Sequence, residues 1–128
     1  DPGDCARMVN QAVADLGRLD YLAANAGTPG TRTTVAPWQL DRLTEEMWDA
    51  VLQVNLLGVF RTIKAAAPAL KAAQGAVVST ASIAGINSPG SSMAYGATKA
   101  GVISLTKNLA RGLAPEVRVN AVAPGAVD

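Results

Sequence analysis

The chain has 128 residues, of which 49% are hydrophobic and 16% are charged, so it can bury a core and is not a disordered tail. Its eleven basic and ten acidic residues give a net charge of +1, which offers no electrostatic basis for binding nucleic acid or a membrane surface. Histidine is absent and Cys5 is the only cysteine, which excludes an internal disulfide and leaves no set of metal ligands.

The N-terminal part of the chain predicts a helix, a strand and a loop. Apolar residues spaced by three or four predict a helix over residues 4–16, which Gly17 ends. Residues 19–27, LDYLAANAG, form a short apolar run closed by small and polar residues, as in a strand that ends in a tight loop. Residues 28–37 contain two prolines, four threonines and no periodicity, so we expect a loop there.

A long helix is expected over residues 44–70. Thr44 is a good N-cap residue, and Glu45 and Glu46 complement the positive end of a helix dipole. Apolar residues then recur at helical spacing as far as Ile63.

The C-terminal part predicts two strands around another helix. Residues 75–82, GAVVSTAS, are typical of a buried strand that turns polar at its end. After a loop, Ser91 or Ser92 can cap a helix that runs to Leu113. Residues 117–125, VRVNAVAPG, predict a final strand that Pro-Gly ends.

Helices and strands thus alternate along the sequence, and the strands are apolar over nearly their whole length. This pattern is typical of an α/β fold in which parallel strands carry helices on both faces. Ligands of such sheets bind at the carboxyl ends of the strands. Polar and glycine-rich segments gather at those three ends: Asn25-Ala26-Gly27, Thr80-Ala81-Ser82 and Ala123-Pro124-Gly125.

Tyr95 and Lys99 are four residues apart on the last predicted helix, so their side chains share one face. An ammonium beside a phenol favours the phenolate and lowers its pKa from about 10 toward neutrality, where a group can transfer protons as histidine does. Alone, the pair equally fits a solvent-facing contact on an amphipathic helix. Ser82, thirteen residues earlier, favours the catalytic interpretation because its hydroxyl could hold a substrate oxygen beside the phenol.

Together these motifs resemble those of the classical short-chain dehydrogenase/reductase family, and the resemblance covers essentially the whole chain. The shared features, in order, are Asn25-Ala26-Gly27 after a strand, Asn55 in the next long helix, Ser82, Tyr95 with Lys99, and Pro124-Gly125 after the last strand. The resemblance implies a Rossmann-type doubly wound parallel sheet, of which this chain holds strands four to six with flanking helices. Residues 1–128 would be the central and catalytic part of a single NAD(P)-binding domain.

The resemblance also implies roles for four side chains. Tyr95 would be the acid/base that exchanges a proton with the carbonyl or hydroxyl oxygen, and Ser82 would hydrogen-bond that oxygen. Lys99 would lower the pKa of Tyr95 and hold the nicotinamide ribose, while Asn55 would hold a water that links Lys99 to solvent. Taken alone, Asn55 would be a satisfied core amide and Ser82 a loop hydroxyl that caps a turn.

The implied cofactor contacts lie at two strand ends. Asn25-Ala26-Gly27 would lie against the adenosine half of NAD or NADP, and the backbone of Pro124, Gly125 and Val127 would meet the nicotinamide carboxamide. Without the resemblance, these are ordinary strand-end turn residues. The residue that selects NAD or NADP follows the second strand of the family, so the preference stays open.

The Gly-rich turn that binds the cofactor pyrophosphate in this family is absent from the sequence. Complete members are about twice this length, so we expect an internal fragment that lacks the N-terminal cofactor motif and the C-terminal substrate loop. In the order 3-2-1-4-5-6 the fourth strand pairs with the first, so such a fragment exposes an apolar edge. Residues 1–128 alone are therefore expected to be aggregation-prone and to bind the cofactor weakly.

The expected function is NAD(P)-dependent interconversion of a carbonyl and a secondary alcohol in a small-molecule substrate. The motifs look most like those of bacterial 3-oxoacyl-acyl-carrier-protein reductases, so a 3-oxoacyl thioester or a similar small ketone is the expected substrate. One alternative is a non-catalytic member that kept the fold as a binding or regulatory module. Another is an extended epimerase/dehydratase relative, although the Asn-Ala-Gly loop and the Ser-to-Tyr spacing favour the classical group.

The sequence and the resemblance also lead to expectations about cellular location and oligomeric state. A single cysteine suits a reducing compartment, no signal-peptide pattern is visible, and no apolar run approaches the roughly 18 residues that span a bilayer. We therefore expect a cytoplasmic protein without a membrane partner. The resemblance implies a homo-oligomer, a tetramer or a dimer, with subunit contacts through the helices over 44–70 and 91–113, although core packing explains their apolar content equally well.

Overall fold

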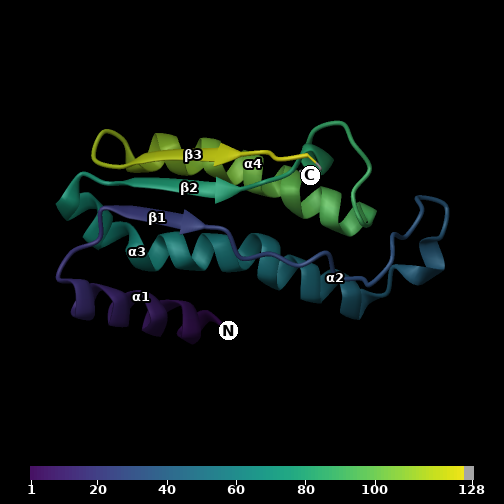
Figure 1. The fold of residues 1–128 in the computed structure, drawn as a ribbon, viewed down its shortest axis with the longest axis horizontal. Coiled ribbons are helices and arrows are strands. Elements are labelled where there is room, and N and C mark those ends of the chain that lie inside the picture. The colour runs from purple at the N-terminus through teal and green to yellow at the C-terminus, as the bar shows by residue number, and fades with distance from the viewer. Residues whose placement is uncertain (126–128) are drawn as a thin grey trace.

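Helices and strands alternate along the chain in the computed structural model, which describes residues 1–125 (Figure 1). The strands are β1 (Tyr21–Ala24), β2 (Ala76–Thr80) and β3 (Arg118–Val122). The helices are α1 (Pro2–Leu16), α2 (Glu45–Leu52), α3 (Val59–Ala73) and α4 (Met93–Leu113). Short 3-10 turns occupy Leu40–Arg42 and Ile83–Gly85. The predicted order of elements is confirmed, with strands shorter than predicted because the strand-end loops do not pair.

The predicted helix caps are also confirmed. Thr44 and Ser92 each accept a side-chain hydrogen bond from the backbone N–H three residues further on, at 3.3 and 3.1 Å. These bonds satisfy donors that have no partner within the first turn of a helix. Gly17 ends α1 in the left-handed conformation, with a φ of 76° that glycine adopts without strain.

The three strands form one parallel sheet in the order β1-β2-β3. Tyr21 pairs with Ala76, and Ala76 pairs with Arg118, so the strands begin at the same level. Their carboxyl ends therefore also lie together, at one edge of the sheet.

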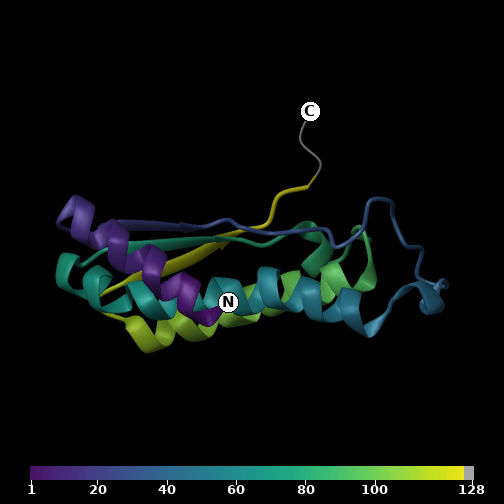
Figure 2. The same ribbon diagram turned by 90° about the horizontal axis from the view of Figure 1, so that it is seen from below.

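The helices lie on one face of the sheet, which corrects the expectation of helices on both faces. Figure 2 views the sheet from its edge and shows α3 and α4 beneath it, while α1 packs against α3. Both crossovers run in the same direction across the sheet, and right-handed connections then place their helices on the same face. Among residues 1–125 no helix covers the opposite face, where Tyr21, Val78 and Val122 are exposed.

The hydrophobic core lies between the covered face of the sheet and the helices. Val77 and Val119 are paired across β2 and β3 and are both buried there. The helices contribute buried residues at helical spacing: Val59, Ile63, Ala66 and Leu70 of α3, and Val102 of α4. Amphipathic helices on an apolar sheet are what the sequence pattern predicted.

A π-helical segment, Gln53–Gly58, joins α2 to α3 without a break in the helix. The helix predicted over 44–70 is therefore α-helical only at its two ends, and it continues to Ala73. A π turn holds one extra residue and changes the direction of its side chains, and such segments are frequent at functional sites. Asn55 lies in this segment and is fully buried.

By length and composition the combined helix from Glu45 to Ala73 could cross a membrane, contrary to the expectation that no segment could. Core helices of globular domains pass the same test, and the buried residues of α3 pack in the core described above. This finding is therefore weak support for a membrane span.

Candidate active site

The loops that follow the three strands are joined by hydrogen bonds at the carboxyl edge of the sheet. Thr80 Oγ1, at the end of β2, donates to Asn25 Oδ1 in the loop after β1 at 2.7 Å. The Ile83 N–H, just beyond β2, donates to Pro124 O in the loop after β3 at 3.1 Å. The three predicted site segments are thus held side by side.

Tyr95 and Lys99 lie one turn apart near the start of α4, as predicted. Lys99 is 4% exposed, and its Nζ donates to Thr80 O at 2.7 Å. The same Nζ lies 5.6 Å from the centroid of the Tyr95 ring, within the range of a cation–π contact. Burial lowers the pKa of the Lys99 ammonium, because the charged form loses its hydration. The pair is a desolvated cation beside a phenol, which excludes the interpretation as a solvent-facing surface pair.

Tyr95 and Lys99 line a cavity of about 380 Å³ at the strand ends. The rest of its wall comes from the loop after β1, the end of β2 and the segment before α4: Asn25, Gly27, Thr28, Pro29, Thr80 and Ser91. The cavity therefore gathers four of the residues predicted from the sequence, namely Asn25, Gly27, Tyr95 and Lys99.

Ser82 begins the short turn after β2, and this turn packs directly on α4. Its Oγ accepts a hydrogen bond from the Ala84 N–H at 3.1 Å, so the hydroxyl keeps its own proton available for another oxygen. The close packing depends on Gly85, because a Cβ there would lie 2.5 Å from the backbone nitrogen of Ala100. Because Gly85 has no side chain, the Ser82 turn can pack against the helix that carries Tyr95.

Asn55 lies behind Gly27 and makes three hydrogen bonds to the protein. Its Oδ1 accepts from Thr28 N–H at 2.7 Å, and its Nδ2 donates to Thr28 O at 2.9 Å and to Thr98 Oγ1 at 3.2 Å. A Cβ on Gly27 would lie 3.4 Å from Asn55 Oδ1 and 3.5 Å from Lys99 Nζ. The space beside Gly27 is therefore bordered by both polar atoms.

The remaining predicted residues lie outside the cavity wall. Ala26 lines an apolar groove between β1, α1 and the π-helical segment. Gly125 packs against Ile83, since a Cβ on the glycine would lie 3.2 Å from Ile83 Cδ1. Val127 lies outside the described residues.

The contacts of two threonines were missed by the sequence predictions, although Thr80 belongs to a strand end where a ligand was expected. Thr80 anchors Lys99 through its backbone carbonyl, which no side-chain pattern could indicate. Thr98 Oγ1 donates to Tyr95 O at 2.8 Å. A signal for Thr98 existed, because a threonine hydroxyl within a helix often bonds to the carbonyl one turn earlier.

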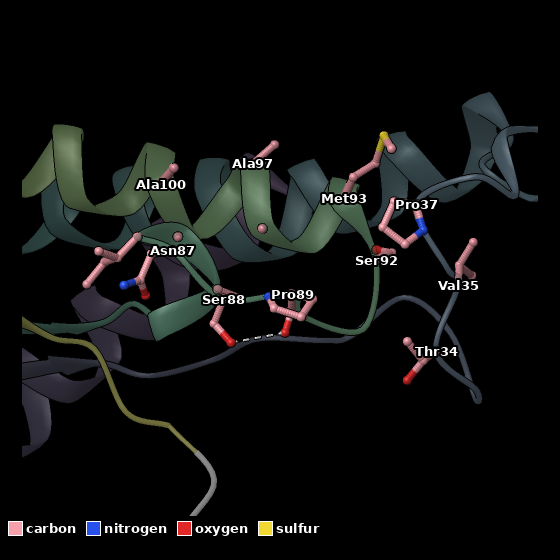
Figure 3. A pocket seen from close by; sticks show the side chains of 15 residues that line it. Thr34, Val35, Pro37, Asn87, Ser88, Pro89, Ser92, Met93, Ala97 and Ala100 are labelled. Carbon is pink, nitrogen blue, oxygen red and sulfur yellow. Dashed lines mark hydrogen bonds between the residues drawn. The ribbon is translucent and has the colours of Figure 1, made fainter.

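A second hollow of about 410 Å³ lies between the loop before α4 and the first turns of that helix (Figure 3). Its wall is largely apolar and includes Val35, Pro37 and Met93. Gly90 also lines this hollow, and a Cβ on it would lie 2.8 Å from Tyr95 Cδ1. The Tyr95 ring is therefore in contact with the loop that forms the second hollow.

The chemistry available at the cavity is proton transfer without a histidine. Tyr95 offers a hydroxyl beside the Lys99 ammonium, and a hydroxyl can give or take a proton. The Ser82 hydroxyl lies on the adjoining turn and can donate a hydrogen bond to an oxygen.

Comparison with known proteins gives a family match along the whole chain. The family model described as short chain dehydrogenase matches residues 1–128. The 3-oxoacyl-acyl-carrier-protein reductase FabG of Staphylococcus aureus (strain Mu50) is 43% identical, over 98% of this chain and 49% of that protein. FabG of Thermotoga maritima is 41% identical, over 100% and 50%. The chain spans about half the length of these relatives.

Solved structures match the fold over the same extent. The structure of NAD+-bound xylitol dehydrogenase has a TM-score of 0.85 at 34% identity, with 98% of this chain and 47% of that chain covered. An alcohol dehydrogenase from the archaeon Thermococcus sibiricus, complexed with 5-hydroxy-NADP, has a TM-score of 0.87 at 29% identity, with 100% and 52% covered.

Proposed function

Because the chain belongs to the short chain dehydrogenase family, we propose that it forms the catalytic part of an NAD(P)-dependent oxidoreductase that interconverts a carbonyl and a secondary alcohol. The observation that carries this proposal is the cavity at the strand ends, where buried Lys99 lies beside Tyr95. Since the chain spans about half of its relatives, residues 1–128 would be the central part of a single Rossmann-type domain and would hold its strands four to six.

The polar wall of the cavity fits the nicotinamide ribose of NAD or NADP. Lys99 uses one of its three N–H donors on Thr80, so two remain to hold ribose hydroxyls. The missing side chain of Gly27 leaves room beside that ammonium. When bound, the nicotinamide would supply or accept the hydride. Both cofactors are candidates, since one similar structure is NAD+-bound and another is complexed with 5-hydroxy-NADP.

The strand-end loops would hold the other parts of the cofactor. Asn25-Ala26-Gly27 would lie against the adenosine half, and the backbone of Pro124, Gly125 and Val127 would meet the carboxamide. The hydrogen bond from Ile83 N–H to Pro124 O supports this arrangement, because it holds the loop after β3 beside the Ser82 turn.

The proton would be exchanged between Tyr95 and the substrate oxygen. Ser82 would donate a hydrogen bond to the same oxygen, because its hydroxyl proton is not used within the turn. The Lys99 ammonium would stabilise negative charge on the Tyr95 oxygen. A water beside Gly27, held by Asn55 Oδ1, would link Lys99 to solvent, since both polar atoms border that space.

We propose a small carbonyl or alcohol substrate, with a 3-oxoacyl thioester or a similar small ketone as the best candidate. The similar proteins of Staphylococcus aureus and Thermotoga maritima are 3-oxoacyl-acyl-carrier-protein reductases. The protein would act in the cytoplasm as a tetramer or a dimer. The exposed Phe60 on α3 and Met93 on α4 are compatible with subunit contacts through these helices.

Replacing Tyr95 by phenylalanine, in the longest native chain that contains residues 1–128, tests this function. Carbonyl reduction with NADH or NADPH should fall by about a hundredfold or more, because a positioned acid or base contributes about 10²–10⁴-fold. Tyr21→Phe is the matched control, since Tyr21 is exposed on the uncovered face of the sheet. Unchanged reduction by Tyr95→Phe would refute the catalytic role. A wild-type chain that binds the cofactor but reduces no ketone would instead favour the non-catalytic module.

A further inference from the structure

Thr98 lies between Tyr95 and Lys99 in the sequence, and its buried hydroxyl both donates and accepts a hydrogen bond. It is 1% exposed, and its Oγ1 donates to Tyr95 O at 2.8 Å. The same oxygen accepts a hydrogen bond from Asn55 Nδ2 at 3.2 Å. One hydroxyl therefore connects the first turn of α4 to the π-helical segment.

The direction of these bonds is determined by the protein itself. The Thr28 N–H can only donate, so the oxygen of the Asn55 amide must face it, at 2.7 Å. The two amide hydrogens then point to Thr28 O and to Thr98 Oγ1, which has to accept. Thr98 must therefore give its own proton to Tyr95 O. The loop after β1, the π-helical segment and α4 are joined in one ordered chain of hydrogen bonds.

We infer that Thr98 is a positioning residue, which holds the Tyr95 turn at a defined place relative to the loop that carries Gly27. This inference rests on the proposed function of Tyr95. Loss of the Thr98 hydroxyl leaves one hydrogen of the buried Asn55 amide without an acceptor, and the structure around it must shift to satisfy that group. Reaction rates respond to such shifts, because a misplacement of about 1 Å can cost about 10²-fold.

Thr106 provides a matched comparison on the same helix. It is also buried, and its Oγ1 donates to Val102 O one turn earlier at 2.7 Å, as Thr98 does to Tyr95. No amide bonds to Thr106 among the hydrogen bonds of residues 1–125. A change from threonine to valine removes one bond from a hydroxyl to a helix carbonyl at either position, and only at Thr98 does it also leave one hydrogen of the Asn55 amide without an acceptor.

The experiment compares Thr98→Val, Thr98→Ser and Thr106→Val in the longest native chain that contains residues 1–128. For carbonyl reduction by Thr98→Val, kcat should fall about tenfold, while the KM for the substrate stays within about twofold of wild type. Thr98→Ser keeps the hydroxyl and should restore kcat. Thr106→Val should keep the wild-type kcat even where its melting temperature falls as far as that of Thr98→Val.

Wild-type kcat in Thr98→Val, or an equal loss in Thr106→Val, would overturn the inference. The hydrogen exchange of the Asn55 side-chain amide, followed by NMR, is the second readout and does not depend on activity. It should be faster in Thr98→Val and unchanged in Thr106→Val, and unchanged exchange in Thr98→Val would also overturn the inference. An inactive wild type in which Thr98→Val still speeds this exchange would instead count against the proposed function alone.

Discussion

The buried ammonium of Lys99 donates a hydrogen bond of 2.7 Å to the backbone carbonyl of Thr80 at the end of β2. This bond ties the helix that carries Tyr95 to the strand that leads into Ser82. The contact holds the position of the cation but does not remove the unfavourable effect of burial, which lowers its pKa. The stability of the fold should therefore depend on the protonation of Lys99.

The unfolding free energy should rise with pH in the alkaline range because of Lys99. Burial lowers the pKa of Lys99 in the folded state, whereas the unfolded chain keeps this proton up to a pKa of about 10.4. Between the two pKa values the unfolded state binds more protons, so raising the pH favours folding. Below that window both states are protonated, and the folded state carries the full unfavourable effect of the buried charge.

Urea denaturation of wild type and Lys99→Met at several pH values, from about 7 to 11, measures this dependence. The unfolding free energy of wild type minus that of Lys99→Met should increase as the pH rises through the window. Lys107→Met, on the exposed side of the same helix, controls for the removal of a lysine. A difference between wild type and Lys99→Met that stays constant with pH would contradict the prediction.

Gly27→Ala should impair proton transfer while the fold stays intact. The new Cβ would lie 3.4 Å from Asn55 Oδ1 and 3.5 Å from Lys99 Nζ, which are ordinary contact distances, so no backbone shift is required. The methyl group would nevertheless occupy the space proposed for a water between these atoms. We expect kcat to fall about tenfold, with an unchanged melting temperature, and cofactor affinity by fluorescence titration should fall as well, because Gly27 also borders the ammonium proposed to hold the ribose.

Gly112→Ala is the control for that substitution, because it adds a methyl group on α4 where nothing lies within 4 Å. It should leave kcat at the wild-type value. If Gly27→Ala keeps the wild-type kcat, the space beside Gly27 carries no water that the reaction needs.

Gly90→Ala should affect Tyr95 by direct contact. The added Cβ would lie 2.8 Å from Tyr95 Cδ1 and 2.9 Å from Ala84 Cβ, which is closer than carbon atoms approach, so the ring or the loop must move. Because catalysis is sensitive to displacements of about 1 Å, kcat should fall by about a hundredfold. Steady-state kinetics beside Gly112→Ala measures the effect, and a wild-type kcat would show that the loop absorbs the added methyl group without moving the ring.

Local rules were sufficient to predict the geometry of the α4 turn that carries Tyr95 and Lys99. Tyr95 and Lys99 share a helix face through their spacing, and Ser92 lies three residues before Tyr95, where an N-cap hydroxyl can accept its N–H. The alternation of elements likewise predicted parallel strands whose ends bring Asn25 and Pro124 toward the segment that holds Ser82.

The contacts that were missed depend on tertiary packing. The apolar periodicity around Asn55 fits an ordinary α-helix, and nothing in it indicates a π turn, which is stabilised by the bonds of Asn55 to Thr28 and Thr98. The helices were expected on both faces because alternation of elements does not specify in which direction each crossover runs. The π turn and the face of the sheet that the helices cover both depend on contacts between segments far apart in the chain.

Ser79→Ala should stabilise the fold, because Ser79 carries a buried hydroxyl with no hydrogen-bond partner among the described residues. A buried polar group without a partner is destabilising by about 1–3 kcal/mol, and alanine removes it with the loss of one atom. The expected rise in unfolding free energy is about 1 kcal/mol.

Ser92→Ala is the opposite case and the matched control for Ser79→Ala. Ser92 is also buried, but its Oγ accepts the Tyr95 N–H at 3.1 Å as the N-cap of α4. Its loss should lower the unfolding free energy by about 1 kcal/mol, as loss of an N-cap usually does. Urea denaturation of the two variants beside wild type measures both changes. A lower unfolding free energy in Ser79→Ala would mean that the Ser79 hydroxyl has a partner in solution. Equal losses in both variants would show that burial alone, and not the presence of a partner, decides the effect of removing a serine hydroxyl here.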